Sequence, residues 1–559
     1  MRKMRFYCLA PLPLGPCLLH KIATLMLISL PAVLSMWAGN KAYSAEKASV
    51  PNIVLILTDD MGFSDLGCYG SEIRTPNLDK LAAGGVRLTQ FYNTGRCCPT
   101  RAALLTGLYS HQVGVGHMVE QYKPPLPGYL GHLNRQCVTF GEALSAAGYH
   151  TLMSGKWHVG QGEGMWPVER GFERFYGMVG GGANYFKPDG RHGPMGLDRQ
   201  EIHPGGGDYY LTDAFTNHAI KFINDASAKD DKPFFLYLAY TAPHWPLHAK
   251  PDDIERYRGK YKAGWDALRA ARHKRQIELG IVDAAWPPTP RGRDIPAWDK
   301  VPPKKQAEMD LRMAVYAAQI DRMDQQIGRV VATLKELKKF DNTLILFLAD
   351  NGGCAEGGVF GFGEIQKGEA APGSVDTWAS YGEGWANASN TPFRRYKHWV
   401  HEGGISTPLV ASWPAGIQPR GKIVPQVGHL IDIMPTLLEV AGAEYPKTYN
   451  GHDILPLAGR SLAPVLKTGQ PMDREPIFWE HEGNRAVRRG QWKLVSQHPG
   501  RWELYDMSKD RTELNNVAAD HADVVAELHT LYDDWAQQSH VLPWPLKGRA
   551  GGKKGGAKK

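Results

Sequence analysis

Two pairs of oxygen-donating side chains stand at the ends of apolar runs in the sequence. Asp59 and Asp60 close the run NIVLILTDD, and Asp350 and Asn351 lie near the end of NTLILFLADNGG. Carboxylate and amide oxygens are the ligands that hard divalent cations such as calcium and magnesium prefer. One acidic pair at a strand end would more often be solvated or cap the next helix. Two such pairs, each followed closely by glycine, favour a shared cation site.

Basic and imidazole side chains follow two further apolar runs. Lys156 and His158 belong to GKWHVG, and His244 belongs to APHWPLH, at the end of the run that begins at Pro233. Alone, each such lysine or histidine would more often be structural or solvated than functional. Together with the acidic pairs, they form a set that can bind an anion and transfer protons.

The stretch GRCCPTRAALLTG puts two adjacent cysteines before a proline and an arginine. Pro99 is typical of the first turn of a helix that would carry Arg101, so we expect Cys97 just before the helix amino terminus. The free N–H groups and the dipole there favour a thiolate nucleophile or a bound oxyanion. Buried packing or a strained vicinal disulfide would also account for Cys97 and Cys98.

Strands that alternate with helices must position these groups. The strand-like runs are residues 52–60, 149–160, 233–248 and 342–353, and the helical patterns include 75–86, 213–226 and 314–337. This alternation predicts an α/β fold with a large, mostly parallel sheet covered by helices. Ligands bind beyond the carboxyl ends of the strands in such sheets. The four runs therefore predict one shared site.

Other segments carry less information. Glycine- and proline-rich loops at 176–207 and 354–391 are long enough to cover a site, and 254–280 is a charged, amphipathic helical insertion. From about residue 470, short antiparallel strands and a closing helix predict a smaller carboxy-terminal subdomain.

At CCPTR, followed by LLTG, the sequence resembles the C-x-P-x-R signature of the type I sulfatases, whose first cysteine is converted enzymatically to formylglycine. The spacing to Pro99 assigns that position to Cys97 and leaves Cys98 in the free position. The resemblance extends from about Asn52 to at least Asn516, and GWDALR and WEHEGNRAVR look most like the bacterial arylsulfatase branch. It implies the alkaline-phosphatase-like α/β sandwich.

The resemblance also implies a cation-binding set and a sulfate-binding set. The implied ligands of calcium, with magnesium as the alternative, are Asp59, Asp60, Asp350, Asn351 and the formylglycine made from Cys97. The implied sulfate-binding groups are Lys156, Lys397 and His244. Lys397 lies five residues before the sequence EGG, and the intervening YKHWVHEGG departs from the commoner small-residue version.

The catalytic roles that the resemblance implies fall on Cys97, Arg101, His158 and His244. A hydroxyl of the hydrated formylglycine attacks sulfur while Arg101 holds the hydroxyls, and His244, alone or with Lys397, protonates the departing oxygen. His158 then deprotonates the second hydroxyl, which expels sulfate. A thiol or a serine has no second hydroxyl, so the modified residue is required.

The implied activity is hydrolysis of sulfate monoesters, either aryl sulfates or small or oligosaccharide sulfate esters, and the implied partner is a formylglycine-generating maturation enzyme. One alternative is a phosphodiesterase or phosphonate monoester hydrolase of the same superfamily. Another is an unmodified protein that binds sulfated glycans without cleaving them. Candidate sugar contacts, each of which could equally be a packing residue, are Trp245, Tyr381, Trp385, Trp399 and His481.

The amino end has the features of an export signal. Arg2, Lys3 and Arg5 precede an apolar stretch, and AYSA offers small residues for cleavage. An uncleaved anchor is the alternative, and no later segment is apolar enough to span a bilayer, so no stable membrane insertion is expected. We therefore predict a signal peptide at 1–45 and a periplasmic or secreted protein.

The net charge of +8 is carried by the ends of the chain. Residues 1–45 hold five basic and no acidic residues, and 547–559 hold six basic and no acidic residues, which leaves a net charge of −3 between them. Nucleic acid is therefore not an expected partner. The predicted organisation is a catalytic domain at 50–465, a subdomain at 466–545 and a disordered basic tail at 546–559.

Overall fold

The protein is described by a computed structural model that covers residues 50–119 and 122–548. The predicted signal peptide and residues 549–559 of the predicted tail lie outside the described residues. Within the described ranges, no helix combines the length and apolar character needed to cross a bilayer. The predicted boundary at residue 465 stays a prediction.

A mixed sheet of ten strands runs through the described residues. Its strands are β1 (Asn52–Thr58), β2 (Val86–Tyr92), β3 (His150–Lys156), β4 (Arg174–Met178), β5 (Met195–Leu197), β6 (Gln200–Ile202), β7 (Phe234–Ala239), β8 (Thr343–Ala349), β9 (Ser406–Ser412) and β10 (Lys422–His429). Their order is β10-β2-β9-β8-β1-β7-β3-β4-β5-β6. The neighbours β8, β1, β7 and β3 are parallel, whereas β9 runs antiparallel between β8 and β2. The predicted large, mostly parallel sheet is confirmed.

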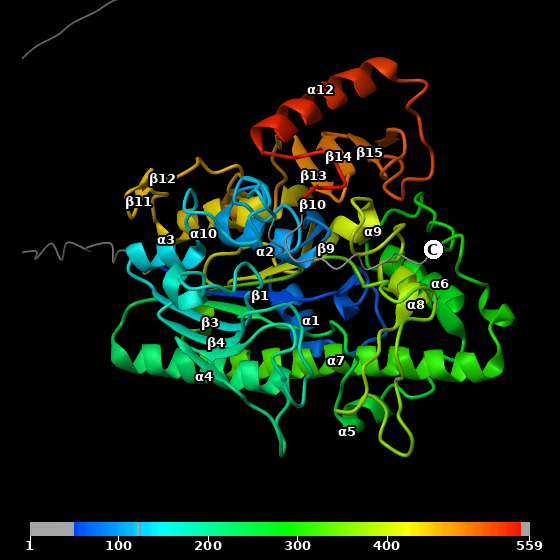
Figure 1. The fold of residues 1–559 in the computed structure, drawn as a ribbon, viewed down its shortest axis with the longest axis horizontal. Coiled ribbons are helices and arrows are strands. Elements are labelled where there is room, and N and C mark those ends of the chain that lie inside the picture. The colour runs from blue at the N-terminus through cyan, green and yellow to red at the C-terminus, as the bar shows by residue number, and fades with distance from the viewer. Residues whose placement is uncertain (1–49, 120–121, 549–559) are drawn as a thin grey trace, which may run out of the picture. The chain divides into compact units, whose positions relative to one another are not determined.

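Helices cover both faces of this sheet (Figure 1). On one face lie α1 (Pro76–Ala83), α4 (Leu211–Lys229) and α7 (Pro303–Glu336), and on the other lie α2 (Cys97–Thr106), α3 (Phe140–Ala146) and α10 (Ile433–Ala441). A hydrophobic core lies on each face of the sheet, and side chains of β1 pack into both. Val54 and Ile56 pack into one core, and Ile53, Leu55 and Leu57 pack into the other. Burial on both faces explains the continuous apolar runs in the sequence.

The four runs singled out in the sequence are the strands β1, β3, β7 and β8. They lie side by side in the sheet, so their carboxyl ends share one edge, as predicted. The helices expected at 75–86, 213–226 and 314–337 are α1, α4 and α7.

Three segments differ from the expectation. The loop at 176–207 contains the hairpin β5–β6, and the loop at 354–391 contains α8 (Gly382–Ser389). The insertion at 254–280 is not one helix, because α5 (Pro251–Glu255) is separated from α6 (Gly264–Glu278). Gly259 and Gly264 have φ of 80° and 81°, a left-handed conformation that interrupts a right-handed helix and that glycine adopts without steric cost.

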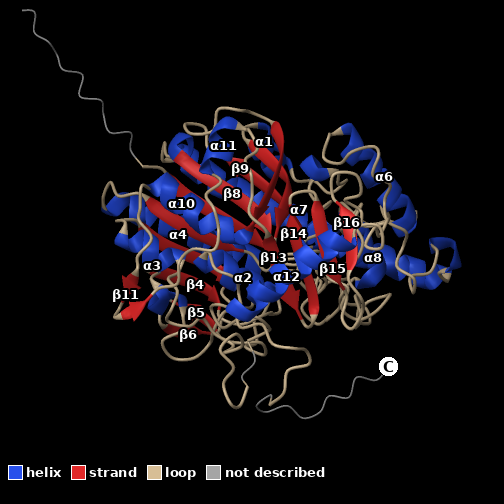
Figure 2. Cartoon of the chain, turned by 90° about the horizontal axis from the view of Figure 1, so that it is seen from above, coloured by secondary structure: helices blue, strands red, loops and turns tan. Residues whose placement is uncertain are grey.

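A second, antiparallel sheet follows near the carboxy terminus. Its strands are β13 (Ile477–His481), β14 (Asn484–Arg489), β15 (Trp492–Ser496) and β16 (Glu503–Asp506), and the closing helix is α12 (Ala522–Gln538). Figure 2 shows these strands grouped with α12. The other α-helices and strands of the described residues are α9 (Glu402–Ile405), β11 (Thr448–Tyr449), β12 (His452–Asp453) and α11 (Ala463–Thr468). The predicted short antiparallel strands and closing helix are confirmed.

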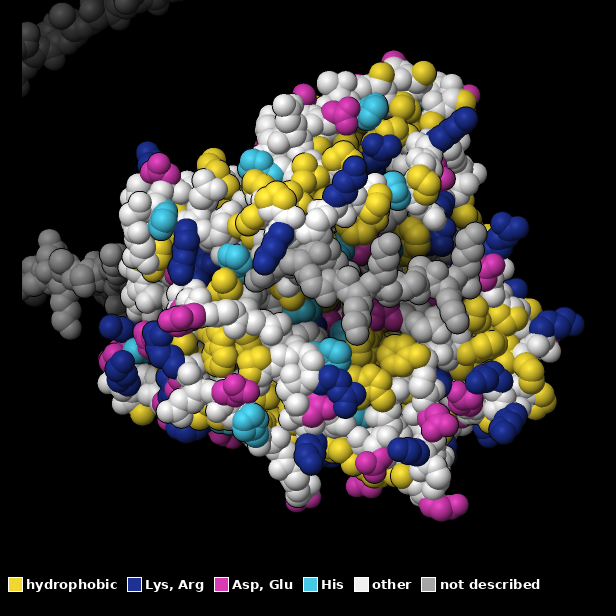
Figure 3. Space-filling view, viewed as in Figure 1, with side chains coloured by type: hydrophobic (Ala, Val, Ile, Leu, Met, Phe, Trp, Pro, Cys, Tyr) yellow, Lys and Arg dark blue, Asp and Glu magenta, His cyan; other side chains and the backbone are white. Residues whose placement is uncertain are grey.

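Charged side chains are mixed over the face shown in Figure 3. Basic and acidic groups alternate there over both the main sheet and the carboxy-terminal elements. This distribution agrees with the small net charge that the sequence assigns to the chain between its basic ends.

Candidate active site

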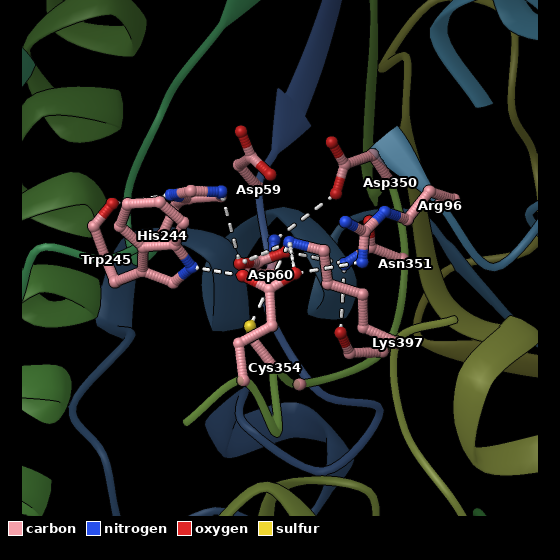
Figure 4. Close-up of polar contacts among 12 residues, drawn as sticks. Asp59, Asp60, Arg96, His244, Trp245, Asp350, Asn351, Cys354 and Lys397 are labelled. Atoms are coloured by element: carbon pink, nitrogen blue, oxygen red, sulfur yellow. Dashed lines mark hydrogen bonds and ion pairs between the residues drawn. The ribbon is translucent and has the colours of Figure 1, made fainter. Parts of the chain in front are cut away.

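The carboxyl ends of β1 and β8 hold four oxygen-donating residues together. Asp350 donates its N–H to the carbonyl of Thr58 (3.0 Å), and Asp60 donates its N–H to Asp350 Oδ1 (3.2 Å). Asp60 has a φ of 62°, which is uncommon outside glycine. Its carboxylate accepts a hydrogen bond from Asn351 Nδ2 at 2.7 Å. With Asp59, these residues form one fully buried cluster (Figure 4).

Helix α2 brings residue 97 to the same edge of the sheet. The helix begins at Cys97 itself, one residue earlier than expected. The Thr100 hydroxyl donates to the carbonyl of Asp350 (2.6 Å), and the N–H of Thr94 donates to Thr100 Oγ1 (3.1 Å). These bonds tie the first turn of α2 to the end of β8. The helix terminus therefore favours an anion next to the acidic cluster.

Arg101 is buried between two carboxylates of this cluster. Its Nη2 lies 2.8 Å from Asp350 Oδ2 and 3.3 Å from Asp59 Oδ2, and its Nη1 donates to the carbonyl of Lys156 at 2.9 Å. Arginine stays protonated in proteins. The guanidinium is therefore a fixed positive charge one helical turn after residue 97.

Two lysines reach the acidic cluster from different elements. Lys156, the last residue of β3, has its Nζ 2.6 Å from Asp59 Oδ2. Lys397 has its Nζ 2.9 Å and 3.0 Å from the two carboxylate oxygens of Asp60 (Figure 4). Burial alone would lower the pKa of each lysine, but Asp59 and Asp60 raise it, so both are charged. The structure thus brings Lys397 to the site despite its unusual sequence context.

His244 lies beyond the end of β7 and faces the cluster. Its Nδ1 donates a hydrogen bond to the carbonyl of Trp245 at 2.5 Å. Its Nε2 lies 3.5 Å from Asp60 Oδ2 and is the ring nitrogen left to meet a substrate. The side chain also lines the cavity described below.

His158 lies beside the cysteine pair. It has a φ of 61°, its N–H donates to the carbonyl of Val179 at 3.1 Å, and its Nε2 lies 3.2 Å from Cys98 Sγ. Burial lowers the pKa of His158 to about 4, and Lys156 acts in the same direction. The ring is therefore neutral at neutral pH and can accept a proton.

The two adjacent cysteines are buried and unbridged, which excludes the vicinal disulfide. Cys97 lines the cavity, whereas Cys98 lies behind it with its Sγ 3.7 Å from Met118 Sδ. A hydrogen bond from Cys98 lowers the pKa of the Cys97 thiol well below its usual value, and Lys156 and His158 add to this effect against burial. Of the pair, Cys97 is the one that a substrate can reach.

A cavity of about 390 Å³ opens above residue 97. Cys97, His158, His244 and Lys397 line it, and residues 181–182 and 191–193 line it from the loop that was expected to cover the site. Of the groups that the sequence singled out, these four meet at the cavity, and Lys397 and His244 connect it with Asp60 of the acidic cluster.

Sequence reasoning missed Glu356, which also lines the cavity. Its Oε1 lies 2.9 Å from Arg96 Nη1 and 3.7 Å from Lys397 Nζ, and its Oε2 accepts a hydrogen bond from Trp245 Nε1 at 2.6 Å. Burial alone would raise the pKa of Glu356, but Lys397 and Arg96 hold it well below its usual range. No motif marks this residue, and only its position in the 354–391 loop connected it with the site.

The predicted aromatic and histidine contacts separate into two groups. Trp245 lines the cavity, where it is available to a substrate ring. Tyr381, Trp385 and His481 are at most 2% exposed, and Trp399 packs against the core. Burial therefore supports the packing alternative for all of these except Trp245.

The donor set fits a hard divalent cation. Asp59 Oδ1 and Asn351 Oδ1 are buried oxygens without a hydrogen-bond partner among the described residues. Burial raises the pKa of Asp350 well above its usual value, and the neighbouring Asp59 carboxylate adds to this effect. Unpartnered buried acceptors and mutually repelling carboxylates are costly unless a cation accompanies them.

Comparisons with known proteins agree with this fold and site. The family model "Sulfatase" matches residues 51–443, and "N-sulphoglucosamine sulphohydrolase, C-terminal" matches 394–538. The chain is 34% identical to an arylsulfatase of Klebsiella aerogenes over 78% of this chain and 96% of that protein. It is also 34% identical to an uncharacterised sulfatase of Schizosaccharomyces pombe over 82% of this chain and 87% of that protein.

A solved structure extends the likeness to the fold. Ps i-CgsB in complex with k-i-k-neocarrahexaose superimposes with a TM-score of 0.66 at 26% identity, covering 89% of this chain and 95% of that one. The fold is thus that of the alkaline-phosphatase-like hydrolases, as the resemblance implied. The chain belongs to the sulfatase family, and it is an enzyme that hydrolyses sulfate esters.

Proposed function

We propose that the protein hydrolyses sulfate monoesters with residue 97 in its formylglycine form and with a divalent cation held by Asp59, Asp60, Asp350 and Asn351. The observation that carries the proposal is the meeting of Cys97, Lys397 and His244 at one cavity. Next to it lies the buried cluster in which Lys156 and Arg101 contact Asp59 and in which two oxygens lack a partner among the described residues. We propose calcium as the cation, with magnesium as the alternative, because every fixed protein donor is an oxygen.

Formylglycine and the divalent cation would supply two kinds of chemistry. Hydrated formylglycine offers a geminal diol as the nucleophile, and the cation when bound withdraws charge from the sulfate oxygens. Arg101 holds the side chain of residue 97 in position from one helical turn away. Lys156 and Lys397 neutralise the anionic ester, since both are charged and held at the cluster.

Two histidines move the protons. Because Nδ1 of His244 is engaged with the Trp245 carbonyl, the protonated ring donates from Nε2 to the departing oxygen. Neutral His158 lies beside residue 97, where it would accept the proton of a hydroxyl on that side chain as sulfate leaves. The different surroundings of the two rings suit these opposite roles.

The substrates that we propose are sulfated carbohydrates and simple aryl sulfates. Trp245 at the cavity offers a face to a sugar or an aromatic ring. The Klebsiella relative is named an arylsulfatase, and Ps i-CgsB was solved with a neocarrahexaose. We further propose that the protein is exported and that a formylglycine-generating enzyme matures it.

Paired variants at the adjacent cysteines test the nucleophile. Cys97→Ala is expected to lower kcat for an aryl sulfate at least about 1,000-fold, as nucleophile removal does in other covalent enzymes. Cys98→Ala is expected to retain most of the activity, because Cys98 does not line the cavity. Equal losses in the two variants would contradict the assignment.

The remaining superfamily alternative is a phosphodiesterase or phosphonate monoester hydrolase. It is tested by comparing kcat/KM for an aryl sulfate with that for the matching aryl phosphate diester and aryl phosphonate. We expect the sulfate to be the better substrate, and a faster diester or phosphonate reaction would overturn this order.

Family membership already favours an enzyme over a protein that only binds sulfated glycans.

A further inference from the structure

Three histidines and a glutamate converge beside the active-site cavity without belonging to it. They are His117 in the segment after α2, His398 next to Lys397, His481 at the end of β13, and Glu482 in the β13–β14 turn. His117 Nε2 lies 2.7 Å from Glu482 Oε1, and His398 Nδ1 lies 3.4 Å from Glu482 Oε2. The imidazole rings of His117 and His481 stack at 5.5 Å.

In this histidine cluster, the ring nitrogens of His481 lack the hydrogen bonds that buried polar atoms normally make. His481 is fully buried, yet neither ring nitrogen has a hydrogen-bond partner among the described residues. Glu482 Oε1 lies 3.8 Å from Nε2, beyond hydrogen-bond distance. Buried polar atoms are almost always satisfied, so an unsatisfied imidazole points to a missing partner. The nearby His111 differs, because its Nε2 is paired with Glu480 at 2.8 Å.

The turn that carries Glu482 is also unusual. Glu482 and Gly483 have φ of 52° and 79°, the pattern of a two-residue turn that prefers asparagine, aspartate or glycine at its first position. A glutamate there is strained, and strain of this kind is retained where it serves a site. The turn brings the carboxylate within reach of all three imidazole rings.

We propose that His117, His398, His481 and Glu482 form a binding site for a divalent transition ion of the zinc type. Zinc takes four such nitrogen and carboxylate ligands at about 2.0–2.2 Å, which sets neighbouring ligand atoms roughly 3.3 Å apart. One ligand atom each from His117, His481 and Glu482 lies within 4.8 Å of the others, so small side-chain rotations close the site. Imidazole ligands favour zinc over calcium.

The protonation of two of the histidines, His481 and His398, is compatible with metal binding. Burial lowers the pKa of His481 well below its usual value, and burial also lowers the pKa of His398. Both rings are therefore neutral at neutral pH, which is the form that binds a metal. The ion would join three segments that are distant in sequence: the chain after α2, the Lys397–His398 segment and the hairpin of the carboxy-terminal sheet.

This site shares no ligand with the proposed calcium site, so the two can be measured separately. The full-length protein is first stripped with a chelator and then resupplied with calcium. Cobalt(II) is added as a spectroscopic probe at neutral pH. We expect one equivalent of cobalt with visible absorption bands of a four-coordinate ion and without the near-ultraviolet bands of a cobalt–thiolate bond. Zinc should displace the cobalt and raise the unfolding midpoint.

Matched variants identify the ligands. His481→Ala and Glu482→Gln should each lose the stoichiometric cobalt signal, while His452→Ala, at an exposed histidine of β12, should keep it. Glu482 is partly exposed, so its variant tests the proposal even if His481→Ala does not fold. The proposal is overturned if the wild-type protein binds no stoichiometric cobalt, or if binding survives in Glu482→Gln. Thiolate bands that vanish in Cys98→Ser would also overturn it, because they would assign the ion to the Cys97, Cys98 and His158 cluster.

Discussion

Among the residues that the structure describes, two buried ionic clusters differ in what lies next to them. The first is the active-site cluster around Asp59, Asp60 and Asp350. The second, which we call the sheet-linking cluster, joins the main sheet to the carboxy-terminal sheet, and its members are Tyr92, Glu402, Lys493, Arg511 and Glu513.

In the sheet-linking cluster, both oxygens of Glu402 have protein partners. Oε1 lies 2.9 Å from Lys493 Nζ, and Oε2 accepts from the Tyr92 hydroxyl at 3.0 Å and from Arg511 Nε at 3.1 Å. In the active-site cluster, Asp59 Oδ1 lacks a protein partner among the described residues, and the cluster borders a cavity.

The sheet-linking cluster also has unpartnered atoms, since Arg511 Nη1 and Glu513 Oε1 make no hydrogen bond within the described part of the chain, although Glu513 Oε1 lies 2.8 Å from Lys493 Nζ. The difference is therefore one of position. The active-site cluster contacts Lys397 and His244, which line a cavity, so it suits a ligand, whereas the sheet-linking cluster connects two sheets and serves the fold.

The largest effect on stability is expected from Lys493→Met. The substitution keeps most of the side-chain volume but leaves Glu402 and Glu513 buried without their shared ammonium group. Breaking a buried ion pair in this way costs about 3–5 kcal/mol. Chemical denaturation should show that loss of unfolding free energy, and Lys509→Met, at a side chain that is 83% exposed, should change it little. A change below about 1 kcal/mol for Lys493→Met would remove the distinction between the clusters.

The sheet-linking cluster also predicts a dependence of stability on pH. Burial alone would raise the pKa of Glu402, but Lys493 and Arg511 lower it to about 2. The folded-state pKa lies below that of an unfolded glutamate, so this stabilisation is complete above about pH 4.3 and is lost as the pH falls toward 2. Its size is on the order of 3 kcal/mol.

The measurement is the unfolding free energy of the wild-type protein and of Glu402→Gln between pH 6 and 2. The difference between the two proteins isolates this residue from the other carboxylates. It should shrink as the pH falls below about 4. A difference that stays constant over that range would contradict the depressed pKa.

Chelation followed by calcium should act on the active-site cluster and leave the sheet-linking cluster unchanged. Removing the cation leaves Asp59, Asp60 and Asp350 to repel one another, so the unfolding midpoint should fall, and calcium or magnesium should restore it. At a cation concentration 100 times Kd, the lost stabilisation is about 2.7 kcal/mol. In Asp60→Asn, calcium should restore little of the midpoint. Full restoration there, or no effect of calcium on the wild-type protein, would argue against the assigned ligands.

The smallest effect is expected at Glu356, on the border of the active-site cluster. Its charge repels an anionic ester, so Glu356→Gln should lower KM for an aryl sulfate by about threefold while the amide side chain keeps its contact with Trp245. Glu356→Ala loses the contacts to Arg96 and Trp245 as well and should raise KM. Steady-state kinetics separate the two effects. A higher KM in Glu356→Gln would show that the contacts of the carboxylate with Arg96 and Trp245 matter more for binding than its repulsion of the anionic ester.

Much of the active-site geometry could be predicted from the sequence. Strands β1, β3, β7 and β8 are buried on both faces, so they read as apolar runs, and parallel pairing brings their ends to one edge. The polar residues at those ends therefore had to meet. Residue 97 was singled out by its spacing to Pro99 and Arg101, and the structure places it at the cavity.

Other features could not be predicted because they depend on long-range contacts. Glu356 sits in a long loop, and only its partners Arg96, Trp245 and Lys397 connect it with the site. The sheet-linking cluster joins Glu402 to Lys493 across 91 positions in the chain.

The break between α5 and α6 was missed because the charged, amphipathic pattern continues through Gly259 and Gly264.

The central claim, that residue 97 is formylglycine, is tested most directly by mass spectrometry of the active protein. Trypsin cleaves after Arg96 and Arg101, so residues 97–101 (CCPTR) are released as one peptide. After thiol alkylation, we predict a single alkyl group, on Cys98, and a residue 97 that is lighter by the difference between CH2SH and CHO. Two alkyl groups on this peptide, in a preparation that turns over sulfate esters at full rate, would contradict the claim.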